Sequence, residues 1–115
     1  MQQQYRMRQD RQFRYVYRRG VRVGGRELSL LYVRSQQKRV GFSVGKKVGG
    51  AVVRNRVKRR LREVFRTRMA SMQSGLYVVV ARPGAAELSL AQMNSCVNGL
   101  VGKLQKGRQA PKAAP

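Results

Sequence analysis

The chain has 115 residues, 42% of them hydrophobic, which is enough for one domain with one core. Its 26 Lys and Arg residues against four Asp and Glu residues give a net charge of +22, so a compact form repels itself and the natural partner is a polyanion. The absence of histidine, the single cysteine and the four scattered acids disfavour a protein nuclease site, a zinc site and an internal disulfide.

The N-terminal region begins with residues 1–8, which are rich in Gln and Arg and are predicted to be disordered. They are not a secretory signal, because no apolar segment follows the charges. A short helix comes next, with Asp10 expected to cap its first turn and Gly20 to end it. Its apolar face, spaced by three and four residues, consists of Phe13, Val16 and Tyr17.

Three strands are predicted after this helix. The first two, 21–23 and 26–34, are joined by a tight turn at Gly24-Gly25. The third, 39–45, alternates large and small residues, so its two faces differ. One face carries Val40, Phe42 and Val44, and the other carries Gly41, Ser43 and Gly45.

A long basic helix is predicted from about Ala51 to about Met72, after a break at Gly49-Gly50. Its apolar stripe comprises Val53, Val57, Leu61, Val64, Phe65 and Met69 or Met72. A continuously apolar strand at 76–82 follows, then a loop at 83–88.

The last helix is predicted to start with a capping box formed by Ser89 and Gln92. Cys96 lies on its apolar stripe and reads as an inert core residue. The tail from residue 107 has no core residues and is predicted to be disordered, which leaves a single domain at 9–106.

The order of elements is therefore helix, three strands, helix, strand, helix. It predicts an α+β sandwich around one mixed four-stranded sheet. The third and fourth strands are separated by a helix and can run parallel. By the general rule, the connection between them would be right-handed.

The basic helix is the main functional signal. Its polar residues are Arg54, Asn55, Arg56, Lys58, Arg59, Arg60, Arg62 and Arg66. A solvated charged face is the alternative, but such faces mix signs because like charges one turn apart destabilise a helix. Here Glu63 is the sole acid and is expected to relieve charge locally through Arg59, Arg60 or Arg66. Arginine favours bidentate phosphate contacts, and Asn55 can pair with a base edge or a 2′-hydroxyl. The pattern predicts nucleic-acid binding without separating DNA from RNA.

The stretch "GFSVGKKVGGAVVRNRVKRRLREVF" resembles the signature of the bacterial ribonuclease P protein component. Flanking segments, "FRYVYRRG" and "YVVVARPGAA", look like the same family, so the resemblance covers about residues 10–104. It implies the protein subunit of a ribonucleoprotein that removes the 5′ leader from precursor tRNA, with catalysis by the RNA subunit and Mg²⁺ held with that RNA. It also implies a left-handed crossover around the basic helix.

The resemblance assigns two groups of binding residues and no catalytic or metal-binding residue. RNA-subunit binding falls to Arg54, Asn55, Arg56, Lys58, Arg59 and Arg62. Leader binding falls to Phe13, Tyr17, Phe42, Ser43, Val44, Lys46, Lys47 and Arg82. Phe13 and Tyr17 lie about one helical turn apart. Their alternative role is to anchor a short helix to the core. Family members often carry polar residues where this chain has Gly45 and Gly50, which bears on the leader contacts.

Three other functions compete with this reading. A ribosomal or general RNA-binding protein fits the composition equally well, but does not require the basic-helix motif. A protein nuclease would need carboxylates gathered in space. An anionic membrane is the weaker polyanionic partner, because the longest apolar run, 76–81, is far too short to span one. With Cys96 suited to a reducing compartment, we expect a cytoplasmic protein without an obligate protein partner.

Overall fold

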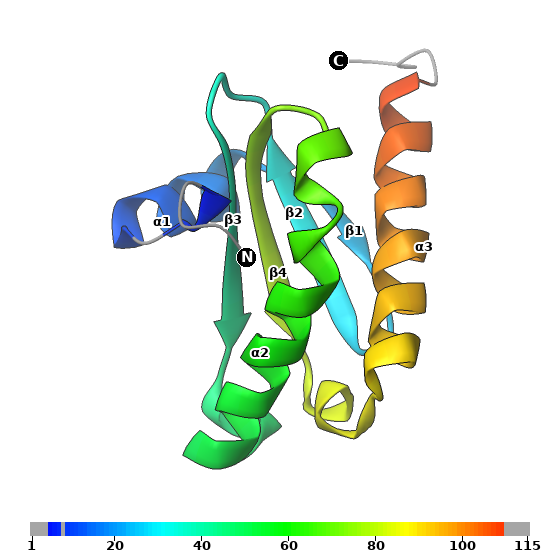
Figure 1. The fold of residues 1–115 in the computed structure, drawn as a ribbon. Coiled ribbons are helices and arrows are strands. Elements are labelled where there is room, and N and C mark those ends of the chain that lie inside the picture. Colours follow the sequence, from blue (N-terminus) through cyan, green and yellow to red (C-terminus); the bar gives the residue numbers. More distant parts are fainter. Residues whose placement is uncertain (1–4, 8, 110–115) are drawn as a thin grey trace.

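The computed structural model describes residues 5–7 and 9–109, which form three α-helices and four strands (Figure 1). In chain order these are α1 (Asp10–Arg19), β1 (Val21–Gly24), β2 (Leu28–Val33), β3 (Lys38–Val44), α2 (Ala51–Arg66), β4 (Gly75–Ala81) and α3 (Leu90–Gln109). Short 3₁₀ turns precede α2, follow it and precede α3: η2 (Lys46–Val48), η3 (Met69–Ser71) and η4 (Pro83–Glu87). The predicted α+β class and element order are confirmed.

The four strands form one mixed sheet in the order β1-β2-β4-β3. β2 is antiparallel to both of its neighbours, and β3 runs parallel to β4 with Val40 opposite Tyr77. β4 is therefore a central strand with neighbours on both sides. This explains its uninterrupted apolar sequence, because side chains on both of its faces are covered.

The connection from β3 through α2 to β4 is left-handed. In Figure 1, β3 runs downward, α2 passes in front of the sheet, and β4 descends again to the right of β3. The right-handed connection expected from the general rule is wrong here, and the family resemblance gave the correct hand. For this strand order, a right-handed path would put α2 on the face where α1 packs and where β3 offers no large apolar side chain, but Arg39, Gly41 and Ser43. The left-handed path lays α2 over Val40, Phe42 and Val44 instead.

Each face of the sheet has its own apolar core. The larger core lies under α2 and α3 and contains Phe65, which is fully buried and packs edge-on against Phe42 with ring centroids 5.7 Å apart. The smaller core lies under α1 and joins Val16 to Leu31 and Val78. Two helices thus cover one face, whereas α1 alone covers part of the other (Figure 1).

The predicted helix to Met72 is too long, since α2 ends at Arg66. Met69 still reaches the core, but from the 3₁₀ turn η3. The Lys38 ammonium donates hydrogen bonds to the backbone oxygens of Met69 (2.9 Å) and Ala70 (3.2 Å). These bonds satisfy carbonyls in the tightened turn that a longer helix would have paired internally.

Of the two helix N-caps predicted from the sequence, the one at α1 is wrong and the one at α3 is confirmed. Asp10 is the first residue of α1 rather than its cap, and the preceding Gln9 makes no capping side-chain bond. The capping box of α3 is confirmed, because the Gln92 amide donates to the Ser89 hydroxyl (3.1 Å) and the Ser89 amide donates to the Gln92 side chain (2.9 Å). The expected loop after β4 is largely the turn η4.

The chain ends are more ordered than predicted where the structure describes them. The Met7 amide donates to the Val40 oxygen (3.0 Å), the Arg39 guanidinium donates to the Arg6 oxygen (3.0 Å), and Met7 is buried. Disorder across 1–8 is therefore wrong for residues 5–7, because β3 offers them an open edge. At the other end α3 continues to Gln109, past the predicted boundary at 107. Residues 1–4, 8 and 110–115 lie outside the described residues.

Candidate nucleic-acid interface

The basic side chains of α2 divide into three rows with different surroundings. The first row, Arg54, Lys58 and Arg62, is half-buried along the flank that faces β3. The Arg54 Nε atom is buried without a hydrogen-bond partner among the described residues. A buried cationic donor without a partner is unfavourable, so this row is suited to receive an anion.

The second row is tied to the segment before α3. The Arg60 guanidinium donates to the Leu88 oxygen at 2.6 Å, and the Arg56 guanidinium lies 3.4 Å from the Ala86 oxygen. Arg60 is thus held by a short charge-assisted bond and fixes the connection between η4 and α3 against α2. Arg56 is exposed and more weakly held, which leaves its guanidinium accessible to an RNA phosphate.

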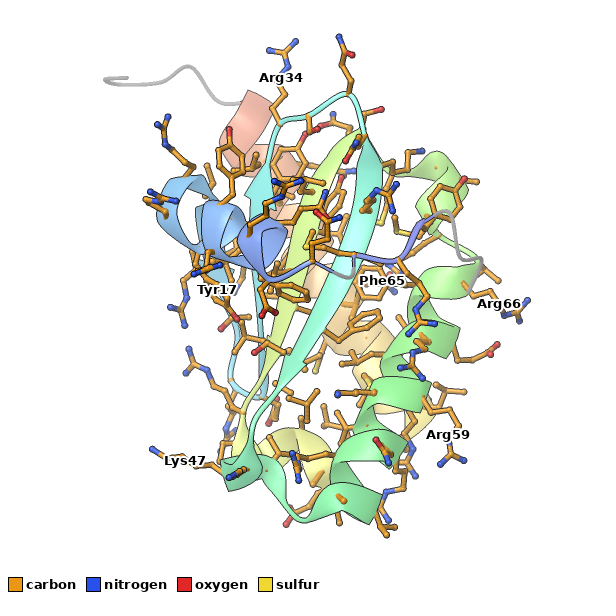
Figure 2. The ribbon with its side chains drawn as sticks, turned by 90° about the vertical axis from the view of Figure 1, so that its left-hand side faces the viewer. Tyr17, Arg34, Lys47, Arg59, Phe65 and Arg66 are labelled. Atoms are coloured by element: carbon orange, nitrogen blue, oxygen red, sulfur yellow. The ribbon has the colours of Figure 1, made fainter. Side chains whose placement is uncertain are left out.

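The third row points away from the sheet and includes the exposed Asn55, Arg59 and Arg66. Figure 2 shows Arg59 and Arg66 projecting from α2 into solvent. Arg66 donates to the Glu63 carboxylate at 2.6 Å, which confirms one of the partners expected for Glu63. This hydrogen bond and the charge of Arg66 hold the pKa of Glu63 below its usual value. The one acid of α2 is therefore neutralised by its own helix.

The turn between β3 and α2 adds two exposed lysines, Lys46 and Lys47. In Figure 2, Lys47 is directed away from α2, toward the side of the sheet on which Tyr17 lies. Gly50 precedes α2 without a side-chain cap, and the first turn contains no acid. The amides of that turn and the two lysines together favour negative charge at this corner of the molecule.

The two aromatic residues of α1 have different environments. Phe13 packs directly on β3 and joins the smaller core, where a Cβ atom added at Gly41 would lie 2.3 Å from its ring. Tyr17 is 46% exposed. The alternative role as a core anchor therefore describes Phe13 better than Tyr17, whose ring can reach a ligand on this face.

Below α1 the sheet has a row made of one fully buried residue, Ser29, and two half-buried residues, Val80 and Ser43. Ser29, Val80 and Ser43 lie opposite one another on β2, β4 and β3. The Ser29 hydroxyl accepts from the guanidinium of Arg82 at 3.1 Å and from that of Arg22 at 3.5 Å. This row, which we call the sheet floor, thus carries two cations at its margin.

Two residues expected on the sheet floor belong to the other face. Phe42 and Val44 point into the larger core under α2, and only Ser43 faces the floor. The cause is the alternation of strand side chains, which places neighbours on opposite faces. Sequence reasoning also missed Arg22 and Ser29. The signal for Arg22 was available, because it lies two residues from the predicted turn that pairs β1 with β2.

The electrostatic balance of the site is strongly positive. The described residues form two ion pairs, Arg26–Glu27 and Glu63–Arg66, against a net charge of +22 for the chain. Within the same residues, no three acidic, His or Cys side chains gather as metal ligands would. The surface can therefore bind and position a polyanion. None of the helices described has both the length and the apolar character to cross a membrane.

A small α+β protein that presents an acid-poor basic helix beside a partly open sheet belongs, as a class, to the nucleic-acid-binding proteins. A family model described as Ribonuclease P matches residues 1–105. The chain therefore belongs to the ribonuclease P protein family. It is an RNA-binding subunit of a ribonucleoprotein enzyme of tRNA processing, which decides against the generic RNA-binding alternative.

Relatives and solved structures agree with this membership. The chain is 41% identical over 91 residues to the ribonuclease P protein component of Streptococcus agalactiae, covering 77% of this chain and 84% of that protein. It is 40% identical over 111 residues to the one from Acidothermus cellulolyticus, covering 92% of each. The fold is similar to the crystallised RNase P protein of Staphylococcus aureus, with a TM-score of 0.82, 27% identity and coverage of 88% of this chain and 95% of that one.

Proposed function

We propose that α2 binds ribonuclease P RNA through its β3-facing row together with Asn55, Arg56 and Arg59, while the sheet floor and Tyr17 bind the 5′ leader of precursor tRNA. The observation that carries the first half is the accessible cationic surface of Arg54, Asn55, Arg56, Lys58, Arg59 and Arg62, on a helix whose single acid is already paired. Its arginines suit phosphates and its asparagine suits a base edge or a 2′-hydroxyl.

The second half is supported by the opposite face of the sheet. On the floor, Val80 and Ser43 are half-buried and can meet a ligand, whereas Ser29 is buried and positions the two arginines. Tyr17, on the same face, is exposed. Arg82 and Arg22 at the margin of the floor supply charge. Unpaired RNA is bound in this way by many proteins, with bases on aromatic rings and phosphates on cations. Phe42 and Val44 are left out of the floor, because their side chains point to the opposite face of the sheet, toward the larger core. Lys46 and Lys47 join the floor to the start of α2, so one strand of RNA can pass from one surface to the other.

Catalysis is assigned to the RNA subunit, and Mg²⁺ is assigned to that RNA. The four acids of the chain lie on α1 (Asp10), the β1–β2 turn (Glu27), α2 (Glu63) and η4 (Glu87), and form no metal site among the described residues. The contribution of this chain is to screen the repulsion between RNA subunit and substrate, which lowers the Mg²⁺ concentration needed. The process takes place in the cytoplasm, where precursor tRNA is matured.

The first experiment is cleavage of a precursor tRNA at low Mg²⁺ by a bacterial ribonuclease P RNA alone, by the protein alone and by both. We expect cleavage at the mature 5′ end in the mixture only. A folded protein that fails to stimulate its cognate RNA would contradict the proposal. Cleavage by the protein alone would contradict the assignment of catalysis to RNA.

A second experiment tests the α2 surface. Replacing Arg54, Arg56 and Arg62 with Ala should weaken RNA-subunit binding and lower the slope of log affinity against log salt by roughly one unit or less per lost contact. Arg26, 93% exposed on the β1–β2 turn, is the matched control, and Arg26→Ala should leave the slope unchanged. Equal slopes for all variants would remove these residues from phosphate contact.

A third experiment separates leader binding from packing. Tyr17→Leu should reduce affinity for precursor tRNA more than for mature tRNA, since only the precursor carries the leader. Phe13→Leu should reduce the free energy of unfolding as well, because its ring fills the space above Gly41. Equal affinity losses for the two tRNAs with Tyr17→Leu would take Tyr17 out of the leader site.

A further inference from the structure

The free edge of β3 carries a cavity that lies between the two proposed RNA surfaces. Its volume is about 280 Å³. It is bounded by Arg6 and Met7 of the N-terminal segment, Phe13 of α1, Phe42 of β3, and Lys58 and Arg62 of α2. Sites for drug-sized ligands usually measure roughly 300–1,000 Å³, so this cavity is suited to a single small group rather than to a folded partner.

The backbone of β3 offers hydrogen bonds toward this cavity. The Val40 oxygen points to the outer side, where it accepts from the Met7 amide at 3.0 Å. Because backbone groups alternate in direction along a strand, the N–H and C=O of Phe42 also point outward, beyond the segment that pairs with Val40. Phe42 thus presents an adjacent donor and acceptor at an edge that no strand of the described chain continues.

The walls of the cavity are cationic. Lys58 and Arg62 are half-buried on the flank of α2 that faces β3, and Arg6 lies on the opposite wall. Arg54, one turn before Lys58 on the same flank, has a buried Nε atom without a partner among the described residues. No acidic side chain lines the cavity. Its occupant should therefore combine a negative charge with groups that can pair with a peptide edge.

We infer that this cavity holds one unpaired nucleotide of RNA, with its base hydrogen-bonded to the N–H and C=O of Phe42 and its phosphate held by Lys58 and Arg62. Nucleobases carry a donor and an acceptor side by side on their edges, which matches a peptide N–H and C=O. The ring of Phe13 lines the same space and can contact the base. The inference rests on the proposed RNA-binding function and adds a base-contacting site to it.

An added strand from another protein is the other occupant known for open sheet edges. It is disfavoured here for two reasons. Residues 6 and 7 already occupy the edge at Val40, which leaves a short stretch of β3 unpaired among the described residues. The three cations around that stretch also favour a phosphate over a peptide backbone.

The first test is an amide-resolved NMR titration of the full chain with AMP and, separately, with inorganic phosphate. AMP should shift the Phe42 amide, whereas phosphate should leave it unchanged. The Val44 amide is the internal control, because it points to the same edge but lies outside the cavity. A Phe42 amide that does not respond to AMP, or that responds equally to phosphate, would overturn the inference.

A variant pair tests the cationic wall. Arg62→Gln should weaken AMP binding several-fold, while Arg66→Gln, one turn later and paired with Glu63 on the outer side, should leave it unchanged. Both variants keep the helix and lose one positive charge. Equal losses would indicate attraction by overall charge rather than a site, and would contradict the inference.

The nucleotide can come from the RNA subunit or from the leader. Hydrogen–deuterium exchange of the β3 segment distinguishes these sources when it is measured in the complex with ribonuclease P RNA, with and without precursor tRNA. Protection with the RNA subunit alone assigns the nucleotide to that RNA, and protection only after precursor is added assigns it to the leader. If both RNAs bind and β3 stays unprotected, the inference fails and the proposed function stands. If a folded protein binds neither RNA, the proposed function fails and the inference falls with it.

Discussion

Charge alone does not define what an arginine of α2 does. Arg54 has a buried Nε atom without a partner, Arg59 is exposed, and Arg60 donates to the Leu88 oxygen at 2.6 Å. These three side chains lie within seven residues of one another and belong to three different rows of the same helix. Arg59 can bind a phosphate without losing an internal contact, whereas Arg60 cannot.

This difference predicts that substitutions at the neighbouring Arg60 and Arg59 affect different properties, stability for the first and RNA binding for the second. Arg60→Gln should lower the free energy of unfolding by about 1–2 kcal/mol, because it removes a charge-assisted bond to a carbonyl. Arg59→Gln should leave stability within about 0.5 kcal/mol and should lower the salt slope of RNA binding instead. Denaturant unfolding and RNA binding at several salt concentrations measure the two effects. A destabilised Arg59 variant with unchanged RNA binding would reverse the assignment.

Cys96 gives a second prediction at the level of a single residue. Burial raises the pKa of its thiol, and the nearby Glu27 carboxylate, 3.9 Å from the sulfur, raises it further. Because the thiolate is the reactive form, alkylation should be slow at neutral pH and should accelerate only above the ordinary pKa of a cysteine. Glu27→Gln should shift the rate profile to lower pH. The denatured chain, alkylated in the same pH series, is the control, and coincident profiles for folded and denatured protein would contradict the prediction.

At the level of elements, apolar periodicity was a good guide to what is buried and a poor guide to where helices end. Met69 is in the core as its position in the stripe predicts, although α2 has already ended at Arg66. The apolar stripe in the sequence indicates only that a side chain points into the core. Past the end of α2, the Lys38 ammonium donates to the Met69 and Ala70 oxygens from 31 and 32 residues away and satisfies them in the 3₁₀ turn. A local pattern does not contain such a contact.

The same limit applies to the site. The motif around Arg54 and Asn55 identified the basic helix, because charge density and spacing are properties of one element. The sheet floor joins Ser29, Ser43 and Val80 from three strands, and only the register brings them together. The alternation within β3 was visible in the sequence and already separated Ser43 from Phe42 and Val44. Placing all three in one site was inconsistent with that alternation.

The packing of α1 on β3 gives a prediction at this scale. A Cβ at Gly41 would lie 2.3 Å from the Phe13 ring and 3.2 Å from the Met7 Cβ atom. Gly41→Ala should therefore push α1 and the N-terminal segment away and lower the free energy of unfolding by about 1–3 kcal/mol. Gly45→Ala is the matched control on the same strand side, since nothing lies within 4 Å of its added Cβ. Equal stability of the two variants in denaturant unfolding would show that α1 does not pack as described.

For the whole molecule, the left-handed crossover explains how one sheet can carry the α2 surface on one face and the sheet floor on the other. It places the basic helix on the face opposite α1, so the β3–α2 turn with Lys46 and Lys47 lies at the boundary between α2 and the sheet floor (Figure 2). Both surfaces therefore meet along β3. The cavity at the β3 edge is lined by residues of α1 and of α2, so RNA bound to either surface can reach it.

The charge of the whole chain predicts that anions stabilise its folded form. A net charge of +22 with two ion pairs among the described residues makes the compact state repel itself. An anion that binds the folded form stabilises it by mass action. Sulfate should therefore raise the melting temperature more than chloride at equal ionic strength. A gain of about 1 kcal/mol corresponds to roughly 4–8 °C for a domain of this size.

A charge-removing variant distinguishes bound anions from the general salting effect of sulfate. Lys58→Gln removes one cation from the half-buried row of α2, so it should raise the melting temperature in low salt and reduce the further gain from sulfate. Arg26→Gln removes one charge from the exposed β1–β2 turn and should leave the sulfate gain unchanged. Thermal unfolding of the three proteins in matched sulfate and chloride series measures this. An identical sulfate gain in all three would mean that the row along β3 holds no anion in the free protein, and that self-repulsion is relieved by screening alone.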